Sequence, residues 1–456
     1  MTKIIKLLSL CLVFGTIVML TDCPINCPHC PGSSPRIPFF MISPNSKMVV
    51  YVKGDSLYSS PITASAQVAL APKFYYNVIG SYYNIAITPD SAKVVYADNA
   101  YNIFSSPINV SMPITIAIAT GANNNFVVTP DGTKVLYTIG PLYYNSGNLL
   151  YSSPIIASVP VLLAQGVNSF LITQNSSVVV FTDSTSMLYS SPITASVPIQ
   201  IAAGVNNFLI TPNCNAVVYT NSSSTLYSSP ITASVPIQIA TRVNNFMITP
   251  NSSEVVYTDS TSNLYSSPII TSAPVLLDTG VKSFTVTPDS THILYTKDWI
   301  PYTSYPFSYS YSLYSSPITA SLPVAIDTNV TSFVVSPDSS KVVYSNDYYY
   351  LYSSPITISA SRFISSGVGN FVITPDSSKV IFTTISSNLY SSPITASVPV
   401  IIDAGKGTGS FLLTPDSKMI VYEKAMHNSS GGVNFGLYSS PITASVPVTI
   451  DSGNTY

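Results

Sequence analysis

Charged side chains are scarce in this chain. Asp, Glu, Lys and Arg together make up 8% of its 456 residues, against roughly a quarter in an average soluble protein, and the net charge is −2. No cluster of Lys and Arg is present that could neutralise phosphate groups, which argues against a nucleic-acid partner. Helical periodicity over ten or more residues is absent outside the N-terminus, which argues against a helical domain.

Signatures of catalysis are also missing. The sequence contains neither a Gly-x-Ser-x-Gly elbow nor a sialidase-type Asp box. Most of its 19 carboxylates recur at equivalent places of an internal repeat, which predicts turn and capping roles for them. These residues are Asp90, Asp131, Asp289, Asp338, Asp376, Asp416, Asp98, Asp183, Asp259, Asp347, Asp278, Asp327, Asp403 and Asp451. We therefore predict no catalytic residue and no cofactor.

What the chain has in abundance is that repeat. The hexapeptide Leu-Tyr-Ser-Ser-Pro-Ile, or a close variant of it, occurs ten times. Its aromatic residue is Tyr58, Phe104, Tyr151, Tyr189, Tyr227, Tyr265, Tyr314, Tyr352, Tyr390 and Tyr438. Successive copies are 38 residues apart in five intervals and 46 to 49 apart in the other four, so the extra length is local. A second motif, such as Ile-Thr-Pro-Asp at 373–376, accompanies every copy but one, in which Gln174 replaces the proline.

One period, residues 207–240, indicates what each repeat forms. The segments 208–211, 216–220, 226–231 and 235–240 are short apolar, β-branched or aromatic runs bounded by Pro, Asn and Ser clusters. Such runs are typical of strands, and Thr-Pro-Asp-Ser between the first two strands is typical of a tight turn. We expect a four-stranded antiparallel meander of about 40 residues, with the last proline of each unit, such as Pro399, on the outermost edge strand.

These residues resemble a known group of proteins. The sequences Ile-Thr-Pro-Asp-Ser-Ser-Lys-Val-Ile-Phe at 373–382 and Asn-Leu-Tyr-Ser-Ser-Pro-Ile at 388–394 are similar to the TolB-like, WD-repeat-like β-propeller repeat. The resemblance covers residues 38–456 and implies an all-β propeller of ten four-stranded blades. It implies no single function, because such propellers serve as scaffolds, binding modules and parts of enzymes. Thr-Ala-Ser, where a Gly-rich turn is usual, is a departure from the pattern.

Closure of the propeller has two solutions. Ten blades could form a single ring or two five-bladed rings that divide near Thr241. The even 38-residue spacing crosses that point without a linker, which favours a single ring. The first repeat begins with its inner strand at 39–43 and the last ends with its outer strand at 446–451. We therefore expect the two ends to be held together by packing between blades.

The N-terminus is typical of an export signal. Lys3 and Lys6 precede a 14-residue apolar stretch at 7–20, which is short for a membrane span. Residues 1–22 are predicted to be a signal peptide or a lipoprotein signal with Cys23 as the lipidation candidate; plain secretion and an uncleaved anchor are the alternatives. Residues 23–37 would form a Cys- and Pro-rich linker. The predicted location is extracytoplasmic (secreted, periplasmic or a cell-surface lipoprotein), with membrane anchoring by the N-terminus only.

A small group of cysteines follows that stretch. Cys23, Cys27, His29 and Cys30 have a spacing that could hold zinc, and the cysteines also match the spacing of radical S-adenosylmethionine enzymes, whose α/β barrel the pattern does not predict. We interpret the group as part of a tether and predict no metal site. Cys214 occupies a turn position where other repeats have Ser.

Three long insertions interrupt the repeat. The connection between the second and third strands is long in repeats three, seven and ten, at 139–148, 297–312 and 423–436. In a four-stranded meander these connections share one face, and insertions on one face often mark a binding surface. Because exposed Trp and Tyr combine a large contact area with a polar group, the predicted binding residues are Trp299, Tyr302, Tyr305, Phe307, Tyr309, Tyr143 and Tyr144. The alternative is that the insertion of repeat seven covers the protein's own hydrophobic surface.

Three functions remain open at this point. The first is an interaction scaffold that binds a protein or a cell-surface polymer, including a glycan, through the long loops. The second is a glycan-binding or glycan-cleaving propeller, whose enzymatic form needs convergent carboxylates near Trp299, with Asp298 and Glu423 as candidates. The third is a structural cell-envelope protein without a specific ligand, which the near-identity of repeats four to six favours.

Overall fold

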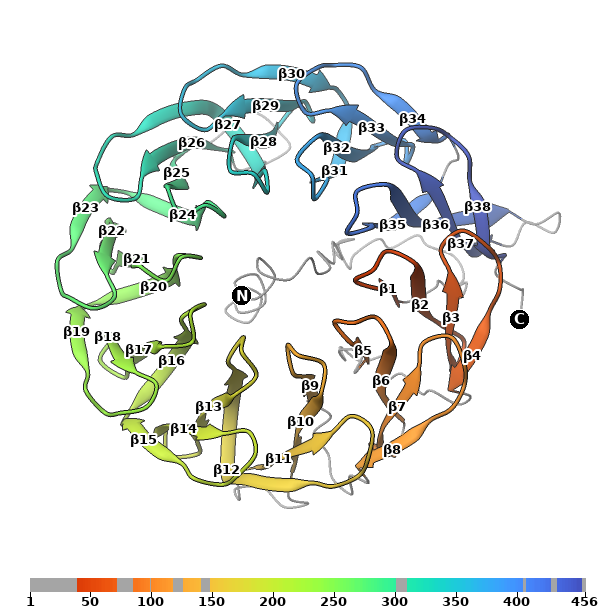
Figure 1. The fold of residues 1–456 in the computed structure, drawn as a ribbon. Helices are drawn as coiled ribbons and strands as arrows, with labels where there is room; N and C mark the ends of the chain where they lie inside the picture. The colour runs from red at the N-terminus through yellow and green to blue at the C-terminus, as the bar shows by residue number, and fades with distance from the viewer. Residues whose placement is uncertain are drawn as a thin grey trace.

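The computed structural model describes residues 39–71, 85–98, 100–117, 126–140, 148–300, 310–404, 407–427 and 433–452. Within these ranges the chain forms strands and turns and no helix. Figure 1 shows the strands as one closed ring of radial sheets, with the first and last sheets side by side. The all-β propeller fold and the single ring are therefore as predicted.

Each sequence repeat forms a four-stranded antiparallel unit, which we call a blade and number by its repeat. The innermost strands are β1 (Phe39–Ile42), β5 (Ile85–Ile87), β9 (Phe126–Val128), β16 (Val205–Ile210), β20 (Val243–Ile248), β24 (Val281–Val286), β31 (Val368–Ile373) and β35 (Thr408–Leu413). The second strands are β2 (Met48–Lys53), β6 (Lys93–Ala97), β10 (Lys134–Ile139), β13 (Val178–Asp183), β17 (Ala216–Asn221), β21 (Glu254–Asp259), β25 (His292–Ile300), β28 (Lys341–Asn346), β32 (Lys379–Thr384) and β36 (Met419–His427).

The hexapeptide forms the third strand of every blade. These strands are β3 (Ser56–Pro61), β7 (Ile103–Pro107), β11 (Asn148–Pro154), β14 (Leu188–Pro192), β18 (Leu226–Pro230), β22 (Leu264–Pro268), β26 (Ser310–Pro317), β29 (Leu351–Pro355), β33 (Leu389–Pro393) and β37 (Val433–Pro441). The outermost strands are β4 (Val68–Ala71), β8 (Ile114–Ala117), β15 (Ile199–Ala202), β19 (Ile237–Ala240), β23 (Val275–Asp278), β30 (Arg362–Ser365), β34 (Val400–Asp403) and β38 (Val448–Asp451). Pro399 lies just before β34 and not within it, which corrects the expected position of that proline.

Two long strands reduce the number of sheets. β12 (Val161–Ile172) and β27 (Val324–Val335) each run from the outer edge of one blade into the inner edge of the next. They join blades three and four, and blades seven and eight, into seven-stranded sheets. The described residues therefore contain eight hydrogen-bonded sheets, although the repeat pattern alone would give one sheet for each blade.

The Pro-Asp motif makes the turn between the first two strands. In blade nine the Thr374 hydroxyl donates to the Asp376 carboxylate at 2.6 Å, and the same carboxylate accepts the backbone N–H of Ser378 at 3.0 Å. Ser377 has a φ of 60°, which a short polar residue tolerates at a turn. The backbone N–H of Asp376 also donates to the Ser417 hydroxyl in the turn of blade ten, and turns are bonded to their neighbours in this way wherever the next turn has a serine at that position.

The residues of the hexapeptide hold the blades together, as blade five illustrates. Leu226 is fully buried, and Tyr227 stacks on Tyr219 of the second strand with 5.5 Å between ring centroids. The Ser228 hydroxyl donates to the backbone oxygen of Ile269 in the next blade, and the Ser229 hydroxyl donates to the backbone oxygen of Ala233 in the following turn. The equivalent of the Ser228 bond forms at eight junctions, although Ser315 of blade seven lacks it, so the motif recurs because it fastens most blades to the next.

The hydrophobic core lies between neighbouring blades, and the same packing closes the ring. One buried cluster combines Phe40, Tyr51 and Ile62 of blade one with Val421 and Ile450 of blade ten. The Ser439 hydroxyl donates to the Ile62 backbone oxygen, which repeats the bond between Ser228 and Ile269. As expected, the two ends of the propeller are held by packing and hydrogen bonds between whole blades.

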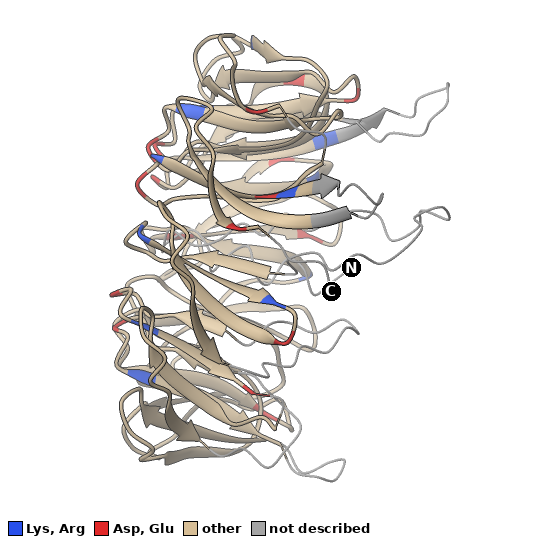
Figure 2. Ribbon diagram, turned by 90° about the vertical axis from the view of Figure 1, so that its right-hand side faces the viewer, with Lys and Arg blue, Asp and Glu red and all other residues tan. Residues whose placement is uncertain are grey.

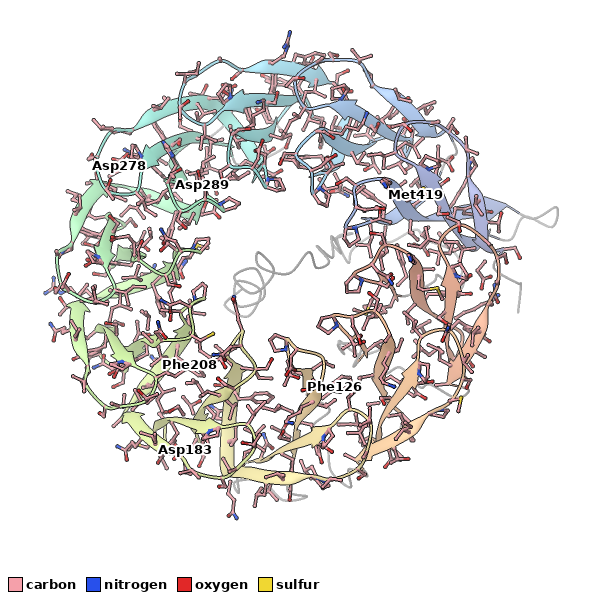
Figure 3. All side chains as sticks on the ribbon, viewed as in Figure 1. Phe126, Asp183, Phe208, Asp278, Asp289 and Met419 are labelled. Carbon is pink, nitrogen blue, oxygen red and sulfur yellow. The ribbon has the colours of Figure 1, made fainter. Side chains whose placement is uncertain are left out.

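Four outer-strand carboxylates act between blades, which adds to the turn or capping role predicted for them; Asp278 and Asp327 also accept the backbone N–H of the residue that follows. Asp278, Asp403 and Asp451 end the fourth strand of one blade, Asp327 has the equivalent position within β27, and each faces a tyrosine or lysine of the next blade. We call these four contacts the acidic junctions. Figure 3 places Asp278 near the outer rim, whereas the turn residue Asp289 lies closer to the axis. The other predicted turn residues include Asp183, which accepts the backbone N–H groups of Thr185 and Met187 as a capping residue does.

Candidate functional site

The ring has two chemically different faces. Strands alternate in direction, so the Pro-Asp turns and the Thr-Ala-Ser turns share one face, which we call the turn face. The connections between the second and third strands share the opposite face, which we call the loop face, with the links between blades. Figure 2 shows the ring edge-on with its few charged residues, several of them on the short turns at one side.

Two hairpins extend beyond the blade on the loop face. In blade five the second and third strands stop pairing at Thr220 and Leu226. In blade seven the pairing of β25 with β26 continues to Ile300 and Ser310, and in blade ten the pairing of β36 with β37 continues to His427 and Val433. The insertions of repeats seven and ten therefore begin as extra hairpin rungs.

The structure places only part of the predicted site. Trp299 lies on β25 and pairs in register with Tyr311 of β26. The other predicted binding residues and the lipidation candidate lie outside the described residues; they are Tyr302, Tyr305, Phe307, Tyr309, Tyr143, Tyr144 and Cys23. Their roles stay predictions, as does that of the Cys23, Cys27, His29 and Cys30 group.

The two carboxylates considered for glycan cleavage are not brought together. Asp298 lies on β25 of blade seven and Glu423 on β36 of blade ten, and Figure 1 shows blades eight and nine between them. The Glu423 side chain is buried and lies over Gly409 of β35, where an added Cβ would be 2.7 Å from its Oε2 atom. The Glu423 carboxylate is thus fitted into its own blade, and the pair that retaining or inverting hydrolysis requires does not form.

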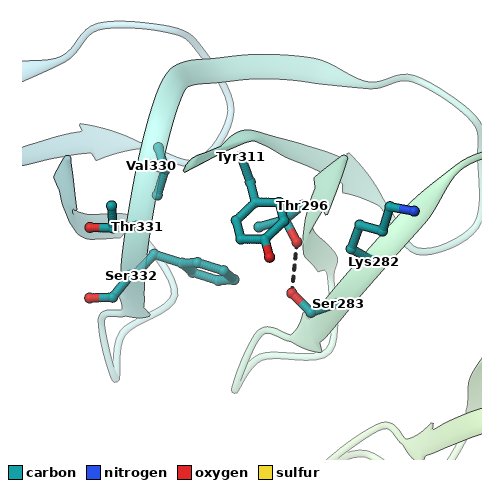
Figure 4. A pocket seen from close by; sticks show the side chains of 8 residues that line it. Lys282, Ser283, Thr296, Tyr311, Val330, Thr331 and Ser332 are labelled. Atoms are coloured by element: carbon teal, nitrogen blue, oxygen red, sulfur yellow. Dashed lines mark hydrogen bonds between the residues drawn. The ribbon is translucent and has the colours of Figure 1, made fainter. Parts of the chain in front are cut away.

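A pocket of about 360 Å³ lies at the base of the extended hairpin of blade seven. Its lining includes Lys282, Ser283, Thr296, Tyr311, Thr331 and Phe333, drawn in Figure 4. Tyr311 comes from the added part of β26, and Thr331 and Phe333 come from β27 as it crosses into blade eight. The pocket therefore lies between two blades on the loop face.

Hydroxyl groups fix the walls of this pocket. The hydroxyls of Ser283 and Thr296 bond each other at 2.7 Å, marked by the dashed line in Figure 4. On the other wall, the Thr331 hydroxyl donates to the Ser345 backbone oxygen at 3.1 Å. Lys282 is exposed, and no carboxylate in the described part of the chain forms an ion pair with it.

An exposed aromatic group lies beside the pocket in blade eight. Tyr348, Tyr349 and Tyr350 are 57%, 56% and 40% exposed in the turn after β28, and Phe363 of β30 is 44% exposed. Tyr350 meets Phe363 edge to face at 6.1 Å between ring centroids. We call these four residues the tyrosine patch.

The turn below the patch is rigidly built. The Asn346 side-chain oxygen accepts the backbone N–H groups of Tyr348 and Tyr350, so Asn346 and not Asp347 caps this turn. Sequence reasoning missed the patch because it ranked connections by length, and this connection has the ordinary length. The available signal was three consecutive aromatic residues at positions where most equivalent turns have Ser, Thr or Asn.

Acidic junctions hold both sides of blade seven. On one side Asp278 accepts hydrogen bonds from Tyr295 at 2.7 Å and from Lys297 at 2.8 Å. On the other side Tyr344 of blade eight donates to Asp327, next to the Ser361 hydroxyl. Lys297 is the residue at which the added rungs of the hairpin start, so the ion pair anchors the hairpin at its base.

These contacts perturb the acidity of both partners. Burial would raise the pKa of the Asp278 carboxyl, but hydrogen bonds from Lys297, Tyr295 and the backbone N–H of Thr279 outweigh it and bring that pKa below its usual value. Burial, and then Asp278, raise the pKa of the Tyr295 hydroxyl well above its usual range. In blade five, which has no such carboxylate, burial raises the pKa of Tyr219 to about 12. At neutral pH the junction therefore contains a charged carboxylate and neutral phenols.

In the part of the chain that the structure describes, no three His, Cys, Asp or Glu side chains gather as metal ligands would. Cys214, in its turn position, is partly exposed and unpaired. Among the described residues there is no helix of sufficient length and apolar character to span a membrane.

Comparisons with known proteins support the fold and little else. No family model matches the chain, and no curated protein does. Among solved structures, the chain is similar to one described as the crystal structure of the eukaryotic initiation factor, with a TM-score of 0.54 and 11% identity over 89% of this chain and 96% of that chain. This likeness concerns the fold alone.

Two further structures are more loosely similar. Oligogalacturonate lyase from Vibrio parahaemolyticus has a TM-score of 0.36 and 13% identity over 64% of this chain and 86% of its own. Dipeptidyl peptidase 4 from Porphyromonas gingivalis has a TM-score of 0.46 and 11% identity over 81% of this chain and 66% of its own. Neither supports an inference about this chain, and the TolB-like resemblance stays a prediction.

Proposed function

We propose that this protein is an extracytoplasmic scaffold that binds a protein or a cell-surface polymer through its loop face, with blades seven and eight as the main contact sector. The observation that carries the proposal is the coincidence, in one sector, of an extended hairpin, a pocket and the tyrosine patch. Exposed aromatic residues grouped beside a recess are the usual centre of a binding surface.

Two features support the extracytoplasmic part of the proposal. Lys3 and Lys6 with the apolar stretch at 7–20 have the layout of an export signal. The surface depends on Ser, Thr, Asn and Tyr for its polarity, with only 8% charged residues. Because Asp298 and Glu423 lie on different blades, we propose no glycan-cleaving activity.

Capture experiments test this function. The mature chain is immobilised and exposed to a cell-envelope extract, beside the variants Trp299→Ala with Tyr302→Ala, and Tyr348→Ser with Tyr349→Ser. The matched control is Val197→Ser with Val235→Ser, because these residues are 58% and 59% exposed on the turn face. We expect both loop-face variants, and not the control, to lose the captured partner. Equal capture by all four proteins would contradict the proposal and favour a structural envelope role.

A further inference from the structure

The pocket between blades seven and eight lies where these blades depart from the repeat. The residue equivalent to Lys282 is Asn206 in blade five, Asn244 in blade six and Gly369 in blade nine, each directly after the first residue of the inner strand. Tyr311 lines the pocket only because β26 begins before the hexapeptide, as part of the extended hairpin. Residues that a blade needs for its fold recur in every blade, so these exceptions require another explanation.

Lys282 supplies one positive charge at the rim of the pocket, where Figure 4 shows its exposed side chain with the ammonium end directed away from the Tyr311 ring. Its ammonium group has no carboxylate partner in the described ranges, whereas Lys53, Lys297 and Lys424 each have one. An unpaired lysine at the rim of a pocket attracts an anionic group of a ligand. Because Lys282 is the only cation among the described lining residues, the site fits a ligand with a single negative charge at that point better than a phosphate-rich one.

The remaining walls fit a sugar ring. Tyr311 and Phe333 offer aromatic surface, and the bonded hydroxyls of Ser283 and Thr296 offer polar contacts beside it. Figure 4 shows the Tyr311 ring between Lys282 on one side and Thr331 on the other. A pyranose likewise has apolar faces made of C–H groups and a polar edge made of hydroxyls. The pocket volume of about 360 Å³ lies in the range of small-ligand sites.

The tyrosine patch extends this surface away from the pocket. Val330, in the pocket wall, pairs in register with Asn346, the residue that caps the turn of Tyr348 and Tyr350. One strand pair therefore supports both features, so a ligand longer than one sugar unit could contact both. Exposed tyrosine rings suit the flanking units, because each offers an apolar face and a hydroxyl.

We propose that the pocket binds one unit of an acidic polysaccharide, with the carboxylate of that unit at Lys282, its ring against Tyr311 and the neighbouring units on Tyr348 and Tyr349. This inference rests on the proposed function and names the chemical class of its partner. It requires no catalytic group and no metal ion. The affinity comes from ring contact, and the selectivity for a charged sugar comes from one lysine.

Affinity electrophoresis of the whole mature chain tests the inference. The gels contain alginate or hyaluronate as acidic polymers, dextran as a neutral polymer, or inorganic polyphosphate. We expect the acidic polysaccharides to retard the protein, dextran and polyphosphate to have little effect, and Lys282→Ala to weaken the retardation about tenfold. Lys341→Ala is the matched control, because it removes the same charge from the turn face, and it should behave as the unaltered protein.

Three results would overturn the inference: no retardation by either acidic polysaccharide, equal retardation by polyphosphate, or equal behaviour of the Lys282 and Lys341 variants. Circular dichroism confirms that each variant is folded before it is used. The envelope capture, repeated after periodate or proteinase treatment of the extract, separates the two proposals. If capture depends on Tyr348 and Tyr349 and is abolished by proteinase but not by periodate, the partner is a protein. That result would contradict the polysaccharide proposal and would still support the scaffold function.

Discussion

The junction between blades five and six and the junction between blades ten and one make nearly the same contacts. In the first, Ser228 donates to Ile269 and Asn213 donates to Ser252. In the second, Ser439 donates to Ile62 and Asp416 donates to Ser46. Only the second has no chain link between its blades, and only the second carries an ion pair, Lys53 with Asp451 at 2.7 Å.

The difference shows where this protein places its few charges. The described residues form three ion pairs, and all three join neighbouring blades at acidic junctions. One closes the ring, and the other two hold Lys297 and Lys424 at the base of the two extended hairpins. At the junction of blades four and five and at that of blades five and six, Ala202 and Ala240 occupy the aspartate position, and apolar packing is sufficient. The ion pairs therefore reinforce the closure of the ring and the bases of the two extended hairpins.

Removing the Asp451 carboxylate, which closes the ring, should lower the stability of the protein more than the other substitutions below. Asp451→Ala leaves Lys53 without its partner and removes the carboxylate beside the buried Tyr51, and breaking a largely buried pair in this way costs about 3 kcal/mol. The measurement is the urea midpoint, with hydrogen exchange to locate the loss. We expect blades one and ten to lose protection before blades five and six.

The control for that variant is Asp416→Ala, which removes an exposed turn carboxylate from the same blade. Its cost should be about 1 kcal/mol or less, as for other turn and capping side chains. If both variants unfold at the same urea concentration, the closing ion pair adds nothing that ordinary packing between blades does not supply.

Two tyrosine substitutions, one at an acidic junction and one at a neutral junction, should have smaller and unequal effects on stability. Tyr422 donates to Asp403 at 2.8 Å, whereas the equivalent Tyr257 belongs to the same packed cluster as Ala240, which has no acceptor in its side chain. Tyr422→Phe should cost about 1.5 kcal/mol, the usual cost of losing a hydrogen bond to a charged group, and Tyr257→Phe less than about 0.5 kcal/mol. Equal shifts of the two urea midpoints would mean that the acidic junctions do not differ from the neutral ones.

Most of the fold could be predicted from the sequence because one repeat describes nearly all of it. Periodic strands, Pro-Asp turns and an even spacing across Thr241 are local signals, and they gave the blades and the single ring. The contacts that Asp278 and Asp403 make between blades were missed because the partner of each carboxylate lies in the next repeat. Lys297 and Lys424, each shortly after a second-strand tyrosine, were the visible signal for that pairing.

The candidate site was only partly predictable for a related reason. Loop length identified the hairpin that carries Trp299, but it could not identify the tyrosine patch, whose connection is short. Nor could sequence separation show that Lys282 and Tyr311 of blade seven line one pocket with Thr331 of blade eight, because β27 brings the two blades together there. A pocket between repeats is a property of their packing, which no single repeat encodes.

The smallest expected effect depends on pH and concerns Asp278. Because its folded-state pKa is below the usual value, the ionised form stabilises the folded protein above the unfolded-state pKa of about 4, and this contribution is lost as the pH falls through the lowered folded-state pKa. Asp278→Asn should therefore cost about 1 kcal/mol at pH 7, and progressively less than that below pH 4. Urea midpoints of both proteins between pH 7 and pH 2.5 measure this difference. A difference that stays constant over that range would mean that the charge on Asp278, and hence its pairing with Lys297, does not stabilise the junction of blades six and seven.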